Sequence, residues 1–203
     1  MKGGDSLSVI TEAIVKRLRD DEFLSGKKDA NGNYLPNTGL LSLMYEAYWD
    51  EATSTEKQRI VPAIYSWQDY TPMIRNDQSK VHLAFIQCAG HVADVPSLRF
   101  GSKSRRARDI TRDILCFYQQ DKKPETADYD YSYVEKMAER VYELFDRQPL
   151  PIPAPDESGH FTTWQTVKCR ANGPIILPYE QSNRFDARLD VMQVTIQFTI
   201  QET

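Results

Sequence analysis

Near its C-terminus the chain carries a stretch of strictly alternating side chains, which reads DVMQVTIQFTI over residues 190–200. The even-numbered positions from Met192 to Ile200 are apolar, whereas the odd-numbered positions from Gln193 to Thr199 carry only amides and hydroxyls. Because successive side chains of a strand point to opposite faces, this pattern predicts a strand with one core face and one polar face. In a ring of subunits, the polar face would line a lumen or meet another ring.

Three segments upstream alternate in a similar way and are predicted as strands, at residues 80–90, 109–119 and 161–171. In the second of them, Ile110 and Ile114 fall on one face, and Leu115 and Phe117 fall on the other. Residues 133–145 instead repeat apolar side chains at helical spacing, from Val134 to Phe145. Residues 7–18 do the same, and Asp5 or Ser6 is placed to cap that helix.

Residues 20–78 are harder to interpret. Residues 20–37 are polar and contain an Asn-Gly turn, which indicates a loop. Residues 40–49 are apolar on nearly every side, and we expect a short buried helix there. Residues 60–67 are β-prone but contain Pro62, which favours an edge strand. The whole pattern predicts one α+β domain over residues 1–203, with an antiparallel sheet of about four strands in β-β-α-β-β order.

Composition narrows the classes of function. The chain has 203 residues, 40% hydrophobic content and a net charge of −4, which argues against a dedicated duplex-DNA binder. Its three cysteines lie far apart in apolar or alternating surroundings, so we expect buried thiols and a reducing compartment. No run of about 18 apolar residues occurs, and residues 1–5 lack the apolar core of a signal peptide, so contact with a membrane is not expected.

Motifs for catalysis or cofactor binding are not found in the sequence. It contains neither a glycine-rich phosphate loop nor a G-x-S-x-G nucleophile elbow. The pair Cys88-x-x-His91 supplies two ligands, whereas a structural zinc site needs four. The acids Asp128, Asp130 and Glu135 precede or begin a helix, where they complement its dipole. We therefore predict no catalytic residue, cofactor or metal, and the alternative is a small metal-dependent nuclease that uses this acidic cluster.

A basic run lies between the strands predicted at residues 80–90 and 109–119. It comprises Arg99, Lys103, Arg105, Arg106 and Arg108. One interpretation is a solvated hairpin loop, because loops lie at the surface. The other is a docking patch for an acidic partner ring or for passing DNA.

These patterns together resemble the tail-terminator, or tail-completion, proteins of tailed bacteriophages. The resemblance rests on the first amphipathic helix, the basic loop before RDITRDI at residues 108–114, the helix at residues 133–145, and the final strand that RFDARLDV introduces at residues 184–191. It covers most of residues 5–20 and 80–203. The segment at residues 20–78 departs from shorter members of the family and is expected to be an insertion.

The resemblance implies a structural virion protein that is assembled in the host cytoplasm and is not an enzyme. Such a protein forms a ring, expected to be a hexamer, that caps the tail tube, ends its polymerisation and joins it to the head connector or neck. DNA only passes through the lumen. The alternatives are a head-completion or neck protein and a minor tail-tube protein. The candidate interface residues are Arg105, Arg106, Arg108, Gln181, Asn183, Arg184, Asp186 and Arg188.

Overall fold

The structure is a computed structural model, and it describes residues 6–66, 84–96, 107–121, 132–150, 164–177 and 187–202. The described helices are α1 (Ser6–Asp20), α2 (Glu22–Ser25) and α4 (Ser132–Phe145). The described strands are β1 (Leu43–Asp50), β2 (Thr55–Pro62), β3 (Ile64–Ser66), β4 (Ala84–Pro96), β5 (Ala107–Asp121), β6 (Trp164–Leu177) and β7 (Ala187–Glu202). In these parts of the chain, no helix is long and apolar enough to cross a membrane.

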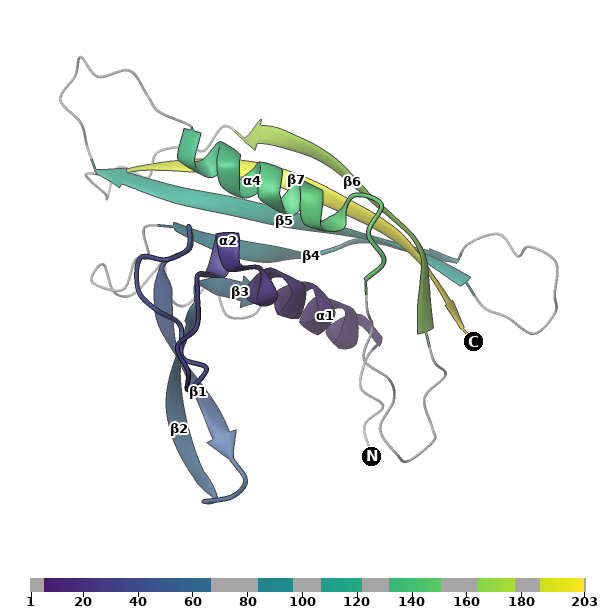
Figure 1. The fold of residues 1–203 in the computed structure, drawn as a ribbon. Coiled ribbons are helices and arrows are strands. Elements are labelled where there is room, and N and C mark those ends of the chain that lie inside the picture. The colour runs from purple at the N-terminus through teal and green to yellow at the C-terminus, as the bar shows by residue number, and fades with distance from the viewer. Residues whose placement is uncertain are drawn as a thin grey trace, which may run out of the picture.

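A five-stranded sheet in the order β3-β4-β5-β7-β6 forms the centre of the molecule (Figure 1). Its pairings are antiparallel, except that the short β3 runs parallel to β4. The final strand β7 lies between β5 and β6, so both of its backbone edges are hydrogen-bonded. The predicted mixed α+β class is therefore confirmed, whereas the sheet has five strands rather than about four.

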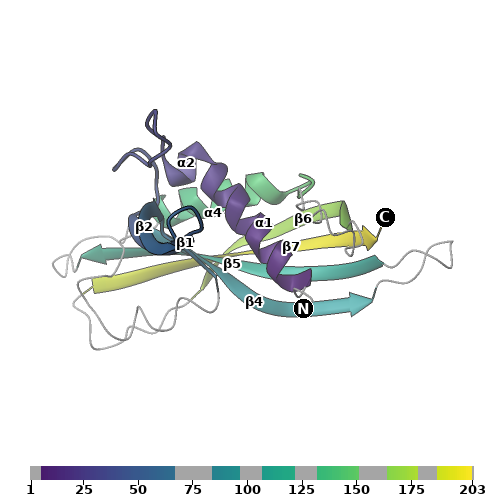
Figure 2. The ribbon, with the colours of Figure 1, turned by 90° about the horizontal axis from the view of Figure 1, so that it is seen from below.

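Helices α1 and α4 cover the same face of this sheet (Figure 2). Helix α4 packs across β5, β7 and β6, and α1 packs beside β3 and β4. The largest buried side chains of this core include Phe145 of α4 and Ile14 of α1, which share one apolar cluster with Ile114, Val194 and Ile196 of the sheet. Burial of a side chain of this size contributes about 1.5–3 kcal/mol. The apolar half of the final strand thus forms part of the core beneath α4, whereas α1 lies over β3 and β4.

The opposite face of the sheet carries a second, smaller apolar cluster at one end. Phe85 of β4 and Phe117 of β5 stack there, with ring centroids 4.6 Å apart, and Tyr65 of β3 meets Phe85 edge-on at 5.8 Å. Met44 of β1 and Val61 of β2 pack against this cluster. The root of the β1–β2 hairpin is therefore anchored on the face that carries no described helix.

Polar contacts tie the first helices to α4. Arg17 donates to the carbonyl oxygens of Leu144, at 3.2 Å, and Pro149, just beyond the end of α4. The buried carboxylate of Asp21 caps α2 by accepting from the Leu24 amide at 3.0 Å, and it also accepts from Arg140 of α4 at 2.7 Å. A helix cap and an ion pair thus share one carboxylate.

One segment does not form the predicted element. Residues 40–49, predicted as a buried helix, contain most of strand β1, which pairs with β2 from Leu43↔Pro62 to Asp50↔Thr55. A short run that is apolar on every side fits either structure, and the pairing partner decides between them. The sequence does not indicate this partner, because the first half of β2 is charged or polar. The region predicted as a loop at residues 20–37 also contains α2.

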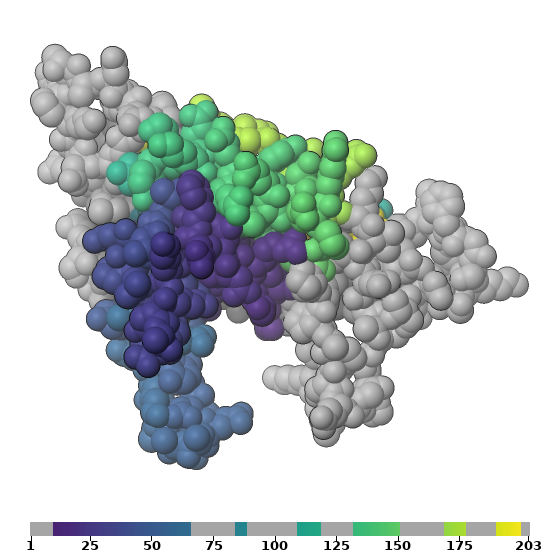
Figure 3. Space-filling view, viewed as in Figure 1, coloured from purple at the N-terminus to yellow at the C-terminus, as the bar shows by residue number. Residues whose placement is uncertain are grey.

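We call the β1–β2 hairpin the arm. It projects from the body beyond the β3 edge of the sheet and stands clear of it in the space-filling view (Figures 1 and 3). Residues 51–54 form its turn, and Ser54 adopts a left-handed conformation there, with φ of 50°. Of its sixteen strand residues, only Met44 and the last two of β2 are buried, so most of the arm is exposed to solvent.

Replacement of Asp21 by alanine should destabilise the fold by about 2–4 kcal/mol, because the change removes the α2 cap and leaves Arg140 without its buried partner. Glu143→Ala is the matched control, since Glu143 is the exposed partner of the same arginine. Urea unfolding of both variants measures the difference. Equal losses of unfolding free energy would contradict the role given to the Asp21 carboxylate.

Candidate assembly surfaces

The first candidate surface is the part of the sheet that faces away from the helices. We call it the polar face, and it is formed by Asp109, Thr111, Asp113, Arg170, Asn172, Gln193, Thr195, Gln197 and Thr199. These residues occupy adjacent registers on β5, β7 and β6. Their position follows directly from the alternation of the strands, because the neighbouring side chains Ile110, Ile114 and Ile196 point into the core.

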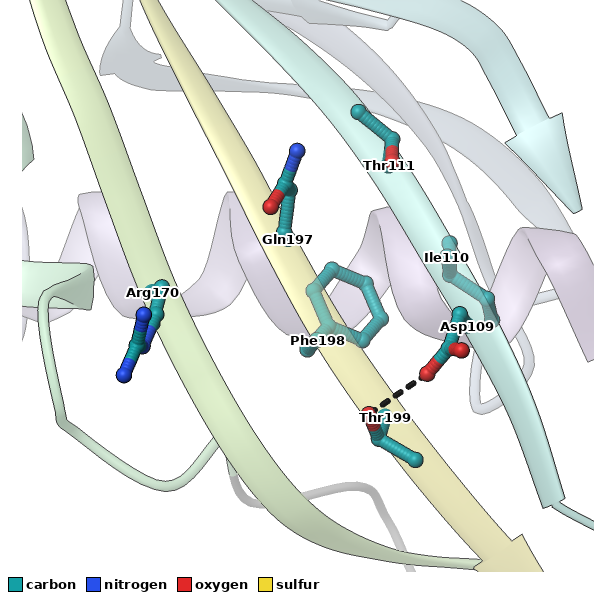
Figure 4. A pocket seen from close by; sticks show the side chains of 7 residues that line it. All are labelled: Asp109, Ile110, Thr111, Arg170, Gln197, Phe198 and Thr199. Atoms are coloured by element: carbon teal, nitrogen blue, oxygen red, sulfur yellow. Dashed lines mark hydrogen bonds between the residues drawn. The ribbon is translucent and has the colours of Figure 1, made fainter. Parts of the chain in front are cut away.

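Hydrogen bonds between directly opposed residues order the polar face. The Thr199 hydroxyl donates to Asp109 at 2.6 Å, and the Thr195 hydroxyl donates to Asp113 at the same distance. Figure 4 shows the first pair beside an open hollow of about 360 Å³, with Arg170 across β7 on the neighbouring strand. The carboxylates of Asp109 and Asp113 are thus held in place by hydrogen bonds on this face of the sheet. A polar surface of this kind can face water or contact another polar surface.

The second candidate surface is the arm, whose two faces differ in character. One face carries the exposed side chains of Tyr45 and Trp49 on β1, and Ile60 lies directly opposite Tyr45 on β2. The sequence alone did not indicate this apolar face, because the helix predicted at residues 40–49 would have buried these aromatics. The one sequence signal for an exposed strand here is the charged segment of β2, because a buried helix at residues 40–49 would not pack against charged side chains.

The other face of the arm is charged and attaches the arm to the body. Glu46 accepts from Arg19 of α1 at 2.7 Å and from Arg59 of β2 at 2.6 Å. Burial alone would raise the pKa of the Glu46 carboxyl, but the hydrogen bonds from Arg19 and Arg59 outweigh it, so the pKa lies below its ordinary value. Arg59 also stacks over the Tyr48 ring, with its guanidinium carbon 5.3 Å from the centroid. The arm is therefore held in one orientation.

Most of the interface residues predicted from the sequence lie outside the described residues, namely Arg105, Arg106, Gln181, Asn183, Arg184 and Asp186. Arg108 and Arg188 lie in β5 and β7, where Arg108 pairs with Ile200 and Arg188 pairs with Gln120. Twelve residues of strand separate these two registers, which corresponds to about 40 Å. The two arginines therefore lie at opposite ends of the sheet and do not belong to one patch.

The structure describes one of the three residues of the acidic cluster and all three cysteines. Glu135 is exposed in the first turn of α4, and Asp128 and Asp130 lie outside the described residues. All three cysteines are buried and unbridged, which confirms the prediction of buried thiols. Burial raises the pKa of Cys88 to about 12 and that of Cys169 to about 11, so neither thiol is a nucleophile near neutral pH. Within the described ranges, no three potential metal ligands form a group.

The polar face should contribute little to the stability of the fold, because its hydrogen bonds are made close to water. Thr199→Val is expected to change the unfolding free energy by no more than about 0.5 kcal/mol. Phe198→Ala, one residue away on the buried face, should cost about 3–5 kcal/mol. Urea titrations of the two variants test this contrast. A Thr199→Val loss as large as that of Phe198→Ala would make the polar face a structural feature rather than a surface free to serve assembly.

The attachment of the arm should weaken in acid. Because folding lowers the pKa of Glu46, its stabilising contribution is complete above the ordinary value of 4.5 and is lost as the pH falls through the lowered pKa. Glu46→Gln should therefore cost about 1–2 kcal/mol at neutral pH and much less at about pH 3. Thermal unfolding at both pH values measures the change, with Glu56→Gln, on the exposed part of β2, as the control. A pH-independent difference between Glu46→Gln and the parent would contradict the ion-pair role.

In comparisons with known proteins, no protein-family model and no curated protein matches the sequence. The two surfaces described above, the polar face and the arm, are therefore what a functional proposal has to rest on.

Proposed function

We propose that this chain is a structural subunit of a tailed-bacteriophage virion, and specifically a tail terminator. In this role, copies of the chain form a closed ring on the end of the tail tube, stop its growth and present a surface to the head connector or neck. The ring is proposed to be a hexamer. The mechanism is the matching of surfaces, and no bond is made or broken.

The observation that carries the proposal is the two-faced character of β7. Its apolar side chains lie in the core beneath α4, and its polar side chains belong to a wide face that no described helix covers. A polar sheet face that contributes little to folding is available for a lumen or for contact with a neighbouring ring. The mixed α+β fold, with its described helices packed on a mostly antiparallel sheet, is also compatible with the central antiparallel sheet and flanking helices that the resemblance implies, and this supports the proposal.

The charges favour passage of DNA over retention of DNA. Among the side chains of the polar face that the structure describes, Asp109 and Asp113 are acidic and Arg170 is basic, and the chain as a whole has a net charge of −4. A surface that binds duplex DNA needs several cations to replace the counterions of the phosphates. Carboxylates, amides and hydroxyls along a lumen would instead remain hydrated while DNA moves through.

The edges of the sheet favour assembly. Among the described strands, β6 forms one outer edge, and β3 covers only three residues of the thirteen-residue β4 at the other. Unpaired edge groups accept a strand of another copy, and a contact between two different surfaces closes into a ring when its rotation allows. These features support self-association of the kind that the proposal requires.

The proposal predicts a defined oligomer that binds tube ends. Six copies of the 23.4 kDa chain should sediment as one species of about 140 kDa, and negative-stain images should show rings with a central opening. Mixed with purified tail tubes, the protein should be found at one end of each tube.

The location on the tube separates the proposal from its alternatives. Decoration along the whole length would indicate a tube subunit, and binding to heads alone would indicate a head-completion or neck protein. Calorimetric titration with Mg²⁺ or Mn²⁺ is the control for the nuclease alternative, for which heat of binding is expected. A protein that stays monomeric at high concentration and binds no tube end would refute the terminator proposal.

A further inference from the structure

Exposed apolar side chains gather at two places on opposite sides of the molecule. On the arm, Tyr45 is 70% exposed, Trp49 is 64% exposed and Ile60 is 42% exposed. At the end of β6, the neighbouring residues Ile175 and Ile176 are 55% and 54% exposed. Isolated apolar side chains on a surface are ordinary, but a group of them on one rigid element marks an interaction site.

The arm is built to present its apolar face rather than to bury it. A two-stranded hairpin is marginally stable in water by itself, and this one is held by the Arg19–Glu46–Arg59 contacts and by Met44 and Val61 at its root. All of these contacts use the other face of the arm or its base. A surface fixed in its binding orientation loses little conformational entropy on association, and tryptophan and tyrosine are the residues that most often dominate interfaces.

The exposed end of β6 owes its shape to an irregularity in the strand. The register between β6 and β7 shifts between Asn172 and Ile175, next to Gly173, whose φ is 108°. A side chain at Gly173 would approach the Gln193 carbonyl oxygen to 2.8 Å, so glycine is required at this bulge. After the bulge, Ile175 lies on the side of the polar face and Ile176 on the helix side, and both remain exposed at the edge.

The positions of the two patches identify the occupant. The arm projects beyond the β3 edge, and Ile175 and Ile176 lie on β6 at the opposite edge of the same sheet (Figure 1). A head-to-tail contact requires two different, matching surfaces on opposite sides of each subunit. This chain has exposed apolar side chains at each side: the face of the arm at one, and at the other the two isoleucines that lie on either face of the β6 edge. The apolar side chains of both patches are uncharged, and the charged Glu56, which lies opposite Trp49 on the same face of the arm, would have to stay in water at the rim of the contact.

We propose that the apolar face of the arm binds the Ile175–Ile176 edge of the next copy of this chain. The arm of each subunit is the donor, and the β6 edge of its neighbour is the receiver, so the contact repeats in one direction around an assembly. This inference rests on the proposed function in that the repeated contact is the one that closes the ring.

The experiment uses one variant of each patch in the full chain. Tyr45→Ser with Trp49→Ser removes the arm patch, and Ile175→Asp removes the receiver. Phe23→Ser is the matched control, because Phe23 is an exposed aromatic residue of α2, 51% exposed, that belongs to neither patch. All substituted side chains are exposed, so unchanged circular dichroism and unfolding midpoints are expected for every variant. Sedimentation velocity at several equal concentrations then gives the assembly state.

Each patch variant should dissociate at concentrations at least about tenfold higher than the parent protein does, whereas the control should match the parent. The decisive sample is an equimolar mixture of the two patch variants. The arm of the receiver variant still fits the edge of the arm variant, so the mixture should form a heterodimer and stop there, because no further intact contact remains. Neither variant alone can form this dimer through the proposed contact.

Three outcomes would overturn the inference. Patch variants that form the same rings as the parent would remove the arm from the interface and leave the proposed ring intact. An effect of the arm variant without an effect of Ile175→Asp, or a mixture with no heterodimer, would show that the arm binds something other than the β6 edge. A parent protein that is monomeric at every concentration would refute both this contact and the ring on which it rests.

Discussion

The pairing of β7 on both sides is the constraint on which the rest of the structure depends. With β5 on one edge and β6 on the other, the strand cannot slip by one residue without moving its whole apolar set to the polar face. The fixed register keeps Val194 and Ile196 under α4, and it also keeps the Thr195–Asp113 and Thr199–Asp109 bonds on the far side. A single alternation therefore creates the core and frees a surface.

The helices sit where that core requires them, and polar contacts fix their mutual position. Arg17 reaches the carbonyl end of α4, and Asp21 joins the start of α2 to Arg140 in the middle of α4. Both arginines come from amphipathic helices whose apolar faces are already buried, so the ionic groups orient the helices rather than drive their folding. In the part of the chain that the structure describes, the helices therefore lie on one face, and the other face carries the arm root and the polar side chains.

The proposed function and the arm contact use the two products of this asymmetry. The polar face provides a polar surface that is not needed for the core, and the arm provides an apolar surface that the subunit itself does not cover. Subunits of assemblies need both kinds of surface, since one must bind a neighbour and the other must stay open to solvent or to a passing chain. The hollow beside Thr199 lies on the polar face and is lined by Asp109 and Arg170 among others (Figure 4).

The sequence by itself determined the elements with a clear period: the helices around Ile14 and Val141, and the faces of β5 and β7, because each of these patterns fits only one regular structure. Tertiary pairing decided the rest. Residues 43–50 became a strand since the charged β2 folded back on them, and the exposed face that carries Trp49 followed from that pairing. Local periodicity specifies an element when one face is buried by a known partner. Where the partner strand is polar, as β2 is in its first half, its sequence does not identify it as a partner, and only the folded chain shows which surface remains exposed.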